Sequence, residues 1–335
     1  MKEILNRLFD YKSLSKSEAK EVLKELATGE FNNSQVAAFL TVYMMRSITV
    51  DELEGFRQAM LELCIPVGID EYKAIDLCGT GGDGKDTFNI STLASFVVAG
   101  SGQNVAKHGN NGVSSVCGSS NLLSHFGYDF TNNIGSIKKS LDEAGICFLH
   151  APLFHPAMKN VAPIRKELGV KTFFNMLGPM VNPSFPKRQL VGVFSLELAR
   201  LYGYLYQKSD CQFSILHSLD GYDEVSLTGP FKAITNQGEE LFQPSDLGLN
   251  KLKPYDLFGG ESIEDAAKIF ENVLKGEGTK PQREVVIANA GLAIACGKNI
   301  TKSEGIEQAK QSLDSGKALE KFKLMIDPKT KISMN

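Results

Sequence analysis

The chain has 335 residues, of which 42% are hydrophobic and 22% charged, enough to build a core for one large or two moderate domains. Its formal net charge of −3 argues weakly against a protein that binds nucleic acid or a membrane surface. No apolar run approaches membrane-spanning length. The six cysteines are scattered, with no CxxC pair, which disfavours a zinc site or a disulfide framework. With no signal peptide either, we expect reduced thiols and a cytoplasmic location.

The first 65 residues have helical periodicity only. Two capping boxes are expected to open the second and fourth helices, Ser15 with Glu18 and Thr49 with Glu52. The third predicted helix, 35–46, capped by Asn33 or Ser34, is apolar nearly all round and needs burial on more than one side. We therefore predict a helical domain, 1–68, that also forms a subunit interface. The alternative is that the second domain alone covers this helix.

From residue 69 to 335, short apolar runs alternate with helical stretches, which predicts an α/β domain with a mostly parallel central sheet. Strands are expected near 72–75, 104–106, 146–149, 190–194 and 213–216, a hairpin over 231–243, and helices over 92–100, 118–126, 134–144, 196–208, 262–274, 282–296 and 303–314. The segment 156–183 interrupts the alternation, and Pro163 predicts a kinked or broken helix there. We expect this segment to join the helical domain and to place a cleft between the domains.

A glycine-rich stretch, Asp76 to Thr92 (DLCGTGGDGKDTFNIST), separates the first expected strand from a helix capped by Ser91 or Thr92. Glycines let backbone N–H groups approach an anion, and a helix N-terminus adds partial positive charge. The spacing matches neither the P-loop nor the dinucleotide-binding fingerprint. We interpret the stretch as a phosphate-binding loop, and a mobile surface loop is the alternative.

A second candidate phosphate loop begins at Lys107-His108-Gly109-Asn110, expected to follow a short strand. The residues behind it are small and polar: Asn111, Gly112, Ser114, Ser115, Gly118, Ser119 and Ser120. A lysine beside many hydroxyl and backbone donors suits phosphate, whereas a solvated turn is the plainer alternative. Two such loops in successive βα units predict a ligand with two phosphate groups at the carboxyl ends of parallel strands.

Adjacent carboxylates, Asp223 and Glu224, occur in a glycine-containing stretch, HSLDGYDEVSLTG. Such a pair is usually solvated, but beside a polyphosphate it can hold Mg²⁺ together with phosphate oxygens and water. Ser91 is a candidate hydroxyl ligand for the same ion. Asp76 and Asp83 are further candidates, although either can instead hydrogen-bond the glycine-rich loop.

Arg165 lies on an apolar face of the helix that Pro163 interrupts. A guanidinium there requires a carboxylate partner, and no local ion pair explains it, although Glu167 is close in sequence. The plainer alternative is an ordinary surface arginine. Of the five histidines only His108 belongs to a motif, and no Ser-His-Asp or Cys-His arrangement stands out.

The stretches DLCGTGGDG, NIST, KHGN, HPAMKNVAPIRKELGVKTFFNMLGPMVNP and DGYDEVSLTG occur in the order seen in the anthranilate phosphoribosyltransferase family, which the chain resembles over essentially its whole length. The resemblance implies a small helical domain and a large α/β domain, a fold shared with class II pyrimidine nucleoside phosphorylases, and a homodimer formed through the helical domain. It also implies transfer of the phosphoribosyl group of 5-phosphoribosyl 1-pyrophosphate to anthranilate, the second step of tryptophan biosynthesis from chorismate.

The resemblance assigns a role to each matching residue. The phosphoribosyl donor would be bound by Gly79, Gly82, Asp83, Thr87, Asn89, Ile90, Ser91, Thr92, Lys107 and Ser119. Anthranilate would lie near Gly79, His108 and Asn110 with Arg165 on its carboxylate, and Ser91, Asp223 and Glu224 would bind Mg²⁺. No residue is assigned as general acid or base, because the aromatic amine is already neutral at pH 7.

The chain departs from the family in one loop. After KHGN the family often carries an arginine and a later lysine, where this chain has Asn111 and Val116. This departure puts the contribution of that loop to phosphate affinity in question. It does not put in question the reaction that the resemblance implies.

Two other functions are compatible with parts of the sequence. A pyrimidine nucleoside phosphorylase-like enzyme would share the fold, but the Asp223-Glu224 pair and the long glycine-rich loop favour pyrophosphate and a metal. A non-catalytic relative that binds nucleic acid would be expected to show a basic face and eroded motifs, whereas this chain has a net charge of −3 and intact motifs.

Overall fold

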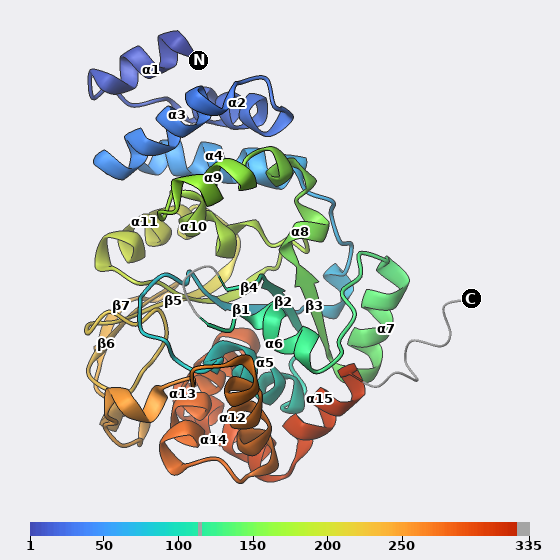
Figure 1. Cartoon of the computed structure of the whole chain (residues 1–335). Coiled ribbons are helices and arrows are strands. Elements are labelled where there is room, and N and C mark those ends of the chain that lie inside the picture. The colour runs from blue at the N-terminus through green and yellow to red at the C-terminus, as the bar shows by residue number, and fades with distance from the viewer. Residues whose placement is uncertain (113–115, 327–335) are drawn as a thin grey trace. The chain divides into compact units, whose positions relative to one another are not determined.

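The structure, a computed structural model, describes residues 1–112 and 116–326 (Figure 1). It divides into two compact units, one made of Met1–Pro66 with Ala151–Phe185 and the other of Val67–His150 with the described residues from Pro186 onward. None of the described helices is long and apolar enough to cross a membrane.

The first unit is entirely helical. Its α-helices are α1 (Lys2–Phe9), α2 (Lys16–Thr28), α3 (Asn33–Met45), α4 (Val50–Leu63), α8 (Ala151–Phe154), α9 (Ala162–Leu168) and α10 (Phe174–Leu177). Both predicted capping boxes are present, at Ser15 and at Thr49. The cap predicted for α3 was wrong: Asn32 accepts from the Gln35 backbone N–H, and the Gln35 side chain accepts from the Asn32 N–H in return, so α3 begins earlier than expected.

The segment that follows His150 packs within this helical unit. A 3₁₀ helix, Pro156–Asn160, precedes α9, and Pro163 occupies the first turn of α9, where its missing N–H costs no helical hydrogen bond. The predicted broken helix is therefore confirmed. Asn160 Nδ2 donates to Ala27 O at 2.7 Å, which joins the segment to α2. The Phe56 and Phe173 rings stack with their centroids 4.5 Å apart in the core of the unit.

The second unit contains a seven-stranded sheet in the order β3-β2-β1-β4-β5-β6-β7. Its strands are β1 (Ile75–Gly79), β2 (Val105–Gly109), β3 (Ile146–His150), β4 (Arg188–Gly192), β5 (Gln212–Ser218), β6 (Phe231–Thr235) and β7 (Gly238–Phe242). The first five run parallel, and β6 and β7 add an antiparallel hairpin. The predicted mostly parallel sheet and the predicted hairpin are both confirmed.

Helices cover this sheet and continue to the end of the described chain. They are α5 (Ile90–Gly100), α6 (Ser119–His125), α7 (Ile134–Ala144), α11 (Leu196–Tyr206), α12 (Ile263–Lys275), α13 (Lys280–Lys298), α14 (Lys302–Asp314) and α15 (Lys317–Ile326). The last of these was not predicted. α5 packs on β1 and β2, whereas α13 packs on β4 and β5, and Figure 1 shows both helices on the same side of the sheet.

Two strands are longer at their carboxyl ends than predicted. β1 includes Asp76–Gly79, which we assigned to the glycine-rich loop, and β2 includes Lys107 and His108, which we placed after the strand. Pairing with neighbouring strands explains both differences, since Gly79 is in register with Gly192 and Gly109 with His150. The helix α5 also starts early, so Ser91 and Thr92 lie in its first turn instead of capping it.

The order of the parallel strands defines where a ligand is expected. β2 and β3 lie on one side of β1, while β4 and β5 lie on the other. The strand order therefore changes direction between β1 and β4, which makes this the topological switch point of the sheet. In sheets of this kind ligands bind outside the carboxyl ends of the strands at that switch point. Gly79, Gly109, Gly192 and Ser218 end their strands at this edge.

Candidate active site

The glycine-rich loop after β1 folds onto the acidic loop after β5. Gly81, Gly82 and Gly84 all have positive φ, at 67°, 77° and 71°, a conformation that glycine adopts without strain. The Gly81 N–H donates to Asp223 Oδ2 at 2.6 Å, and the Thr87 hydroxyl donates to Glu224 Oε1 at 2.8 Å. Two predicted segments that are far apart in sequence therefore meet at the switch point.

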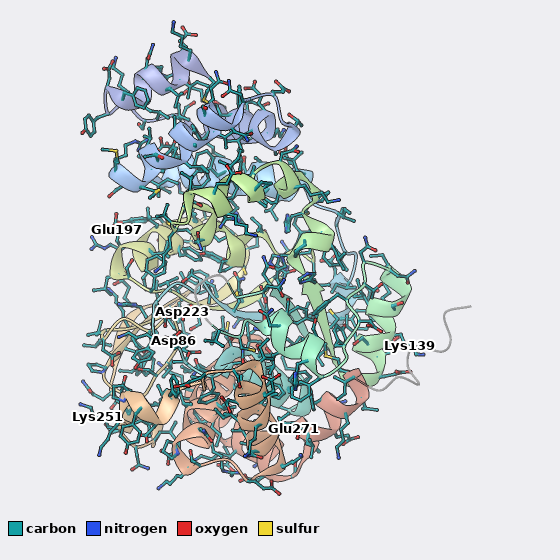
Figure 2. All side chains as sticks on the ribbon, in the orientation of Figure 1. Asp86, Lys139, Glu197, Asp223, Lys251 and Glu271 are labelled. Carbon is teal, nitrogen blue, oxygen red and sulfur yellow. The ribbon has the colours of Figure 1, made fainter. Side chains whose placement is uncertain are left out.

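Close packing holds Asp223 (labelled in Figure 2) against the ends of two strands. A Cβ on Gly79 would lie 2.3 Å from Asp223 Oδ2, and one on Gly192 would lie 1.6 Å from Asp223 O. Both positions thus require glycine. Sequence reasoning missed Gly192, because a glycine at the end of an apolar strand carries no signal of what packs on it.

Burial and mutual repulsion disfavour the charged form of the acidic pair. Burial, followed by the charge of Asp83, raises the pKa of Asp223 to about 7. Burial and the charge of Asp223 raise the pKa of Glu224 well above its usual range. Carboxylates in such surroundings favour a cation as a partner, and perturbed groups of this kind cluster at functional sites.

A small cavity brings the three predicted metal ligands together. Ser91, Asp223 and Glu224 all line it, at the ends of β1 and β4 and beside the first turn of α5. Among residues 1–112 and 116–326, no group of three or more His, Cys, Asp and Glu side chains is arranged to hold a metal by itself. Two carboxylates and a hydroxyl do fit Mg²⁺, which keeps several waters and takes further oxygens from substrate phosphates.

The second phosphate loop lies beside the first. Lys107 is buried, and its Nζ donates to Leu77 O at 2.6 Å and to Ser91 Oγ at 3.3 Å. Burial lowers the pKa of this amine. Asn89 Nδ2 donates to Cys117 O at 2.9 Å, which ties the start of α5 to the second loop. The structure thus places the lysine and the glycine-rich loop around one site.

The rest of the second loop offers few charges. Ser119 Oγ donates to Asn110 O at 3.3 Å, while Asn111 and Val116 are exposed where the family often has basic residues. Ser114 and Ser115 fall outside the described residues. Lys107 is consequently the cation of this loop in the part that the structure describes.

Three further predicted residues face the interior of the α/β unit. Ile90 and Thr92 are buried in the first turn of α5, so their side chains belong to the core, and the Ile90 N–H donates to Phe88 O at 2.6 Å. Asp76 is fully buried in β1 and accepts from His108 N at 3.2 Å and from Gln189 Nε2 at 3.1 Å. This carboxylate binds neighbouring strands, which disfavours the alternative that it holds a metal.

Arg165, on α9 of the helical unit, has polar and aromatic neighbours. Its Nη2 donates to Asn175 Oδ1 at 3.2 Å, and its guanidinium lies 5.2 Å from the centre of the Phe174 ring. Burial lowers its pKa. None of the ion pairs in the described part of the chain involves Arg165, whereas Arg7 and Arg46 of the same unit each pair with a glutamate. A partly buried guanidinium that is not neutralised by a carboxylate of the described chain can bind the carboxylate of a ligand.

Family comparisons place a boundary near residue 67, as the structure does, although the second match also runs through Ala151–Phe185 of the helical unit. Residues 2–64 match the family described as "Glycosyl transferase family, helical bundle domain", and residues 71–319 match "Glycosyl transferase family, a/b domain". The anthranilate phosphoribosyltransferase of Christiangramia forsetii is 61% identical over 96% of this chain and 98% of its own. The chain belongs to the anthranilate phosphoribosyltransferase family. A relative of the same name from Flavobacterium psychrophilum is 62% identical over the same shares of both chains.

Solved structures of the anthranilate phosphoribosyltransferase family have the same fold. The enzyme from Thermus thermophilus superposes with a TM-score of 0.89 at 33% identity, covering 96% of this chain and 98% of that one. The Saccharomyces cerevisiae enzyme "in complex with PRPP and Mg" gives a TM-score of 0.90 at 27% identity, covering 98% and 97%. The predicted fold is confirmed, and the chain is a pentosyl-transferring glycosyltransferase. These relatives favour that class over the phosphorylase and nucleic-acid-binding alternatives.

Proposed function

We propose that this chain transfers the phosphoribosyl group of 5-phosphoribosyl 1-pyrophosphate to the amine of anthranilate, giving N-(5-phosphoribosyl)anthranilate and pyrophosphate in tryptophan biosynthesis. The observation that carries the proposal is the meeting of the glycine-rich loop with Asp223 and Glu224 beside Lys107, at the carboxyl ends of β1, β2, β4 and β5. That arrangement suits a substrate with a pyrophosphate leaving group, and the named relatives supply the identity of the substrates.

Charge develops on the pyrophosphate as its bond to the anomeric carbon breaks. Backbone N–H groups of the glycine-rich loop and of the first turn of α5, together with Lys107, stabilise that charge. These groups are held in place by the fold, so they need no reorganisation during the reaction. Anthranilate attacks the same carbon from its neutral amine, and the nitrogen releases one proton to water or to the departing pyrophosphate as the new C–N bond forms. Positioning therefore contributes more than a strong base. Contacts of the phosphoribosyl donor with Thr87, Asn89 and Ser119 stay predictions from the family resemblance.

Ser91, Asp223 and Glu224 are the residues of this chain that would hold magnesium. Bound Mg²⁺ supplies positive charge to the oxygens of the pyrophosphate leaving group. Support comes from the donor set itself and from the yeast relative that was solved with PRPP and Mg.

An activity assay tests the proposal directly. Purified protein is mixed with 5-phosphoribosyl 1-pyrophosphate, anthranilate and Mg²⁺, and we expect anthranilate fluorescence to fall only when all three are present. Folded protein that leaves the fluorescence unchanged would reject the proposed function. Parallel assays for phosphorolysis of uridine and for gel retardation of a nucleic acid at moderate salt test the two alternatives.

The Arg165→Ala variant should raise the KM for anthranilate about 10- to 100-fold, the usual value of a charge-assisted hydrogen bond, and leave the KM for the phosphoribosyl donor nearly unchanged. The physical reason is that Arg165 has no carboxylate partner of its own in the described chain and is positioned by Asn175. Steady-state kinetics with each substrate varied in turn measures both constants.

The neighbouring Lys166→Ala variant is the control, because Lys166 is an exposed cation on the same helix. Two unchanged KM values in the Arg165→Ala variant would show that Arg165 does not bind the anthranilate carboxylate. The assignments of Gly79, His108 and Asn110 to anthranilate stay predictions.

The proposed homodimer through the helical unit is supported by its exposed apolar side chains. α3 buries Val36, Phe39 and Leu40, yet Met45 at its end is 78% exposed, and Tyr11 is 79% exposed. We expect a dimer at micromolar concentration in sedimentation velocity, and we expect Met45→Glu to shift it toward monomer, because a charge is costly to bury in an apolar contact.

Leu241→Glu is the matched control for the dimer experiment. Leu241 is a similarly exposed apolar residue on β7, in the α/β unit. A monomeric wild-type protein, or equal dissociation by both variants, would contradict an interface on the helical unit.

A further inference from the structure

Asn289 is a polar residue in the apolar middle of α13. It is 3% exposed, and every residue of the helix from Val285 to Ala295 is buried. An amide in such a place is costly unless both its oxygen and its nitrogen are hydrogen-bonded. The bonds that it makes therefore indicate what it is there to hold.

The Asn289 amide pairs with the backbone of a single residue in the acidic loop. Its Oδ1 accepts from Val225 N at 3.1 Å, and its Nδ2 donates to Val225 O at 2.9 Å and to Val285 O at 2.9 Å. An acceptor facing the N–H and a donor facing the C=O fix the orientation of the amide. The side chain thus satisfies both the N–H and the C=O of Val225, as the backbone of a neighbouring strand does in a sheet.

Val225 directly follows the acidic pair, so this bridge also fixes the Glu224–Val225 peptide. Ser218 Oγ donates to Glu224 O at 2.6 Å, which holds the other side of that peptide. Asn289 lines the same cavity as Ser91, Asp223 and Glu224. The acidic loop therefore has two supports. α13 holds it through Val225, and Asp223 packs against the ends of β1 and β4.

We propose that Asn289 is a positioning residue that sets the divalent-cation affinity of the Asp223-Glu224 site by holding the Val225 backbone. The inference rests on the proposed metal role of that pair. Asn289 acts through Val225 and is not itself a ligand. Residues that orient metal ligands from behind typically change metal affinity about 10- to 100-fold when replaced.

The test uses the Asn289→Leu variant, which keeps the branched shape of the side chain and removes its hydrogen bonds. Mn²⁺ binding to the full chain is measured by the electron paramagnetic resonance signal of free Mn²⁺, with and without inorganic pyrophosphate. We expect the variant to bind Mn²⁺ about 10- to 100-fold more weakly than the wild-type protein.

The Gln103→Leu variant is the matched control. Gln103 is a buried amide, 8% exposed, whose Nε2 donates to Lys73 O and Asn104 O at the amino-terminal edge of the same sheet. Its loss should lower thermal stability and leave Mn²⁺ affinity unchanged. Equal Mn²⁺ affinity in wild-type protein and Asn289→Leu would overturn the inference while leaving the proposed function intact. Wild-type protein that binds no Mn²⁺ with pyrophosphate would overturn the metal site and the inference together.

Hydrogen exchange in the wild-type protein keeps the inference testable even if Asn289→Leu fails to fold. The Val225 amide donates to a buried acceptor, so we expect it to exchange as slowly as the amides of β5, with or without Mn²⁺ and pyrophosphate. A Val225 amide that exchanges at the rate of an exposed loop would show that Asn289 does not hold it.

Discussion

The Asp223→Asn, Glu224→Gln double variant is expected to lose its magnesium-dependent rate, a fall of about 10³-fold, the size of effect seen when one stabilising group for developing charge is removed. Both carboxylates line the cavity beside Ser91, and both accept hydrogen bonds from the glycine-rich loop. The amides keep the geometry of those bonds almost unchanged but cannot supply negative charge to a cation. Initial rates across a Mg²⁺ titration measure the effect.

A matched control removes an adjacent acidic pair elsewhere in the same unit. Glu239 and Glu240 are exposed neighbours on β7, where they pair with Lys232 and Lys302. The Glu239→Gln, Glu240→Gln variant makes the same change in net charge and should titrate with Mg²⁺ as the wild-type protein does. If the Asp223, Glu224 variant also kept the wild-type Mg²⁺ curve, the pair would not be the metal ligands.

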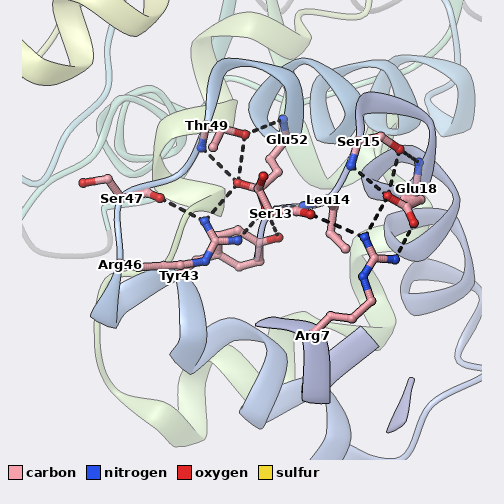
Figure 3. A network of polar contacts seen from close by, with 10 residues as sticks. All are labelled: Arg7, Ser13, Leu14, Ser15, Glu18, Tyr43, Arg46, Ser47, Thr49 and Glu52. Carbon is pink, nitrogen blue, oxygen red and sulfur yellow. Dashed lines mark hydrogen bonds and ion pairs between the residues drawn. The ribbon is translucent and has the colours of Figure 1, made fainter. Parts of the chain in front are cut away.

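Glu52→Ala should destabilise the helical unit by about 3–5 kcal/mol, the usual cost of leaving one member of a buried ion pair alone. Figure 3 shows the fully buried Glu52 carboxylate among its donors. It accepts from Leu14 N at 3.0 Å, from the Tyr43 hydroxyl at 3.1 Å, from Thr49 N at 3.0 Å and from the Arg46 guanidinium at 3.1 Å. Urea unfolding followed by far-UV circular dichroism measures the change.

Glu18→Ala provides the comparison within the same unit. Glu18 also closes a capping box and also pairs with an arginine, Arg7, but both side chains are about 40% exposed to water. Its loss should therefore cost at most about 1 kcal/mol. Equal costs for the two variants would show that burial of Glu52 adds nothing.

The same network makes stability depend on pH with a definite sign. Burial alone would raise the pKa of Glu52, but the bonds from Arg46, Leu14 and Thr49 outweigh it and hold that pKa below its ordinary value of 4.5. Its contribution is therefore complete above about pH 4.5 and is lost as the pH falls through the folded-state pKa. In Glu52→Gln, this part of the acid sensitivity should disappear from a series of unfolding curves between about pH 3 and about pH 7.

Local sequence determined the features that depend on neighbours in the chain. A capping box needs only a side chain and the residue three positions on, so Ser15 and Thr49 were identified correctly. Glycines in the first loop and the carboxylates of Asp223 and Glu224 likewise pointed to phosphate and metal chemistry. The order of apolar runs was enough to predict a mostly parallel sheet.

Only the tertiary structure decided how far each strand extends and what holds the acidic loop. β1 continues to Gly79 because it pairs with β4, whose residues come more than a hundred positions later. Gly192 and Asn289 act on Asp223 and Val225 through close approach and hydrogen bonds between segments that are distant in the chain. Periodicity and spacing record only local preferences, whereas such contacts exist only once the sheet and α13 have packed together.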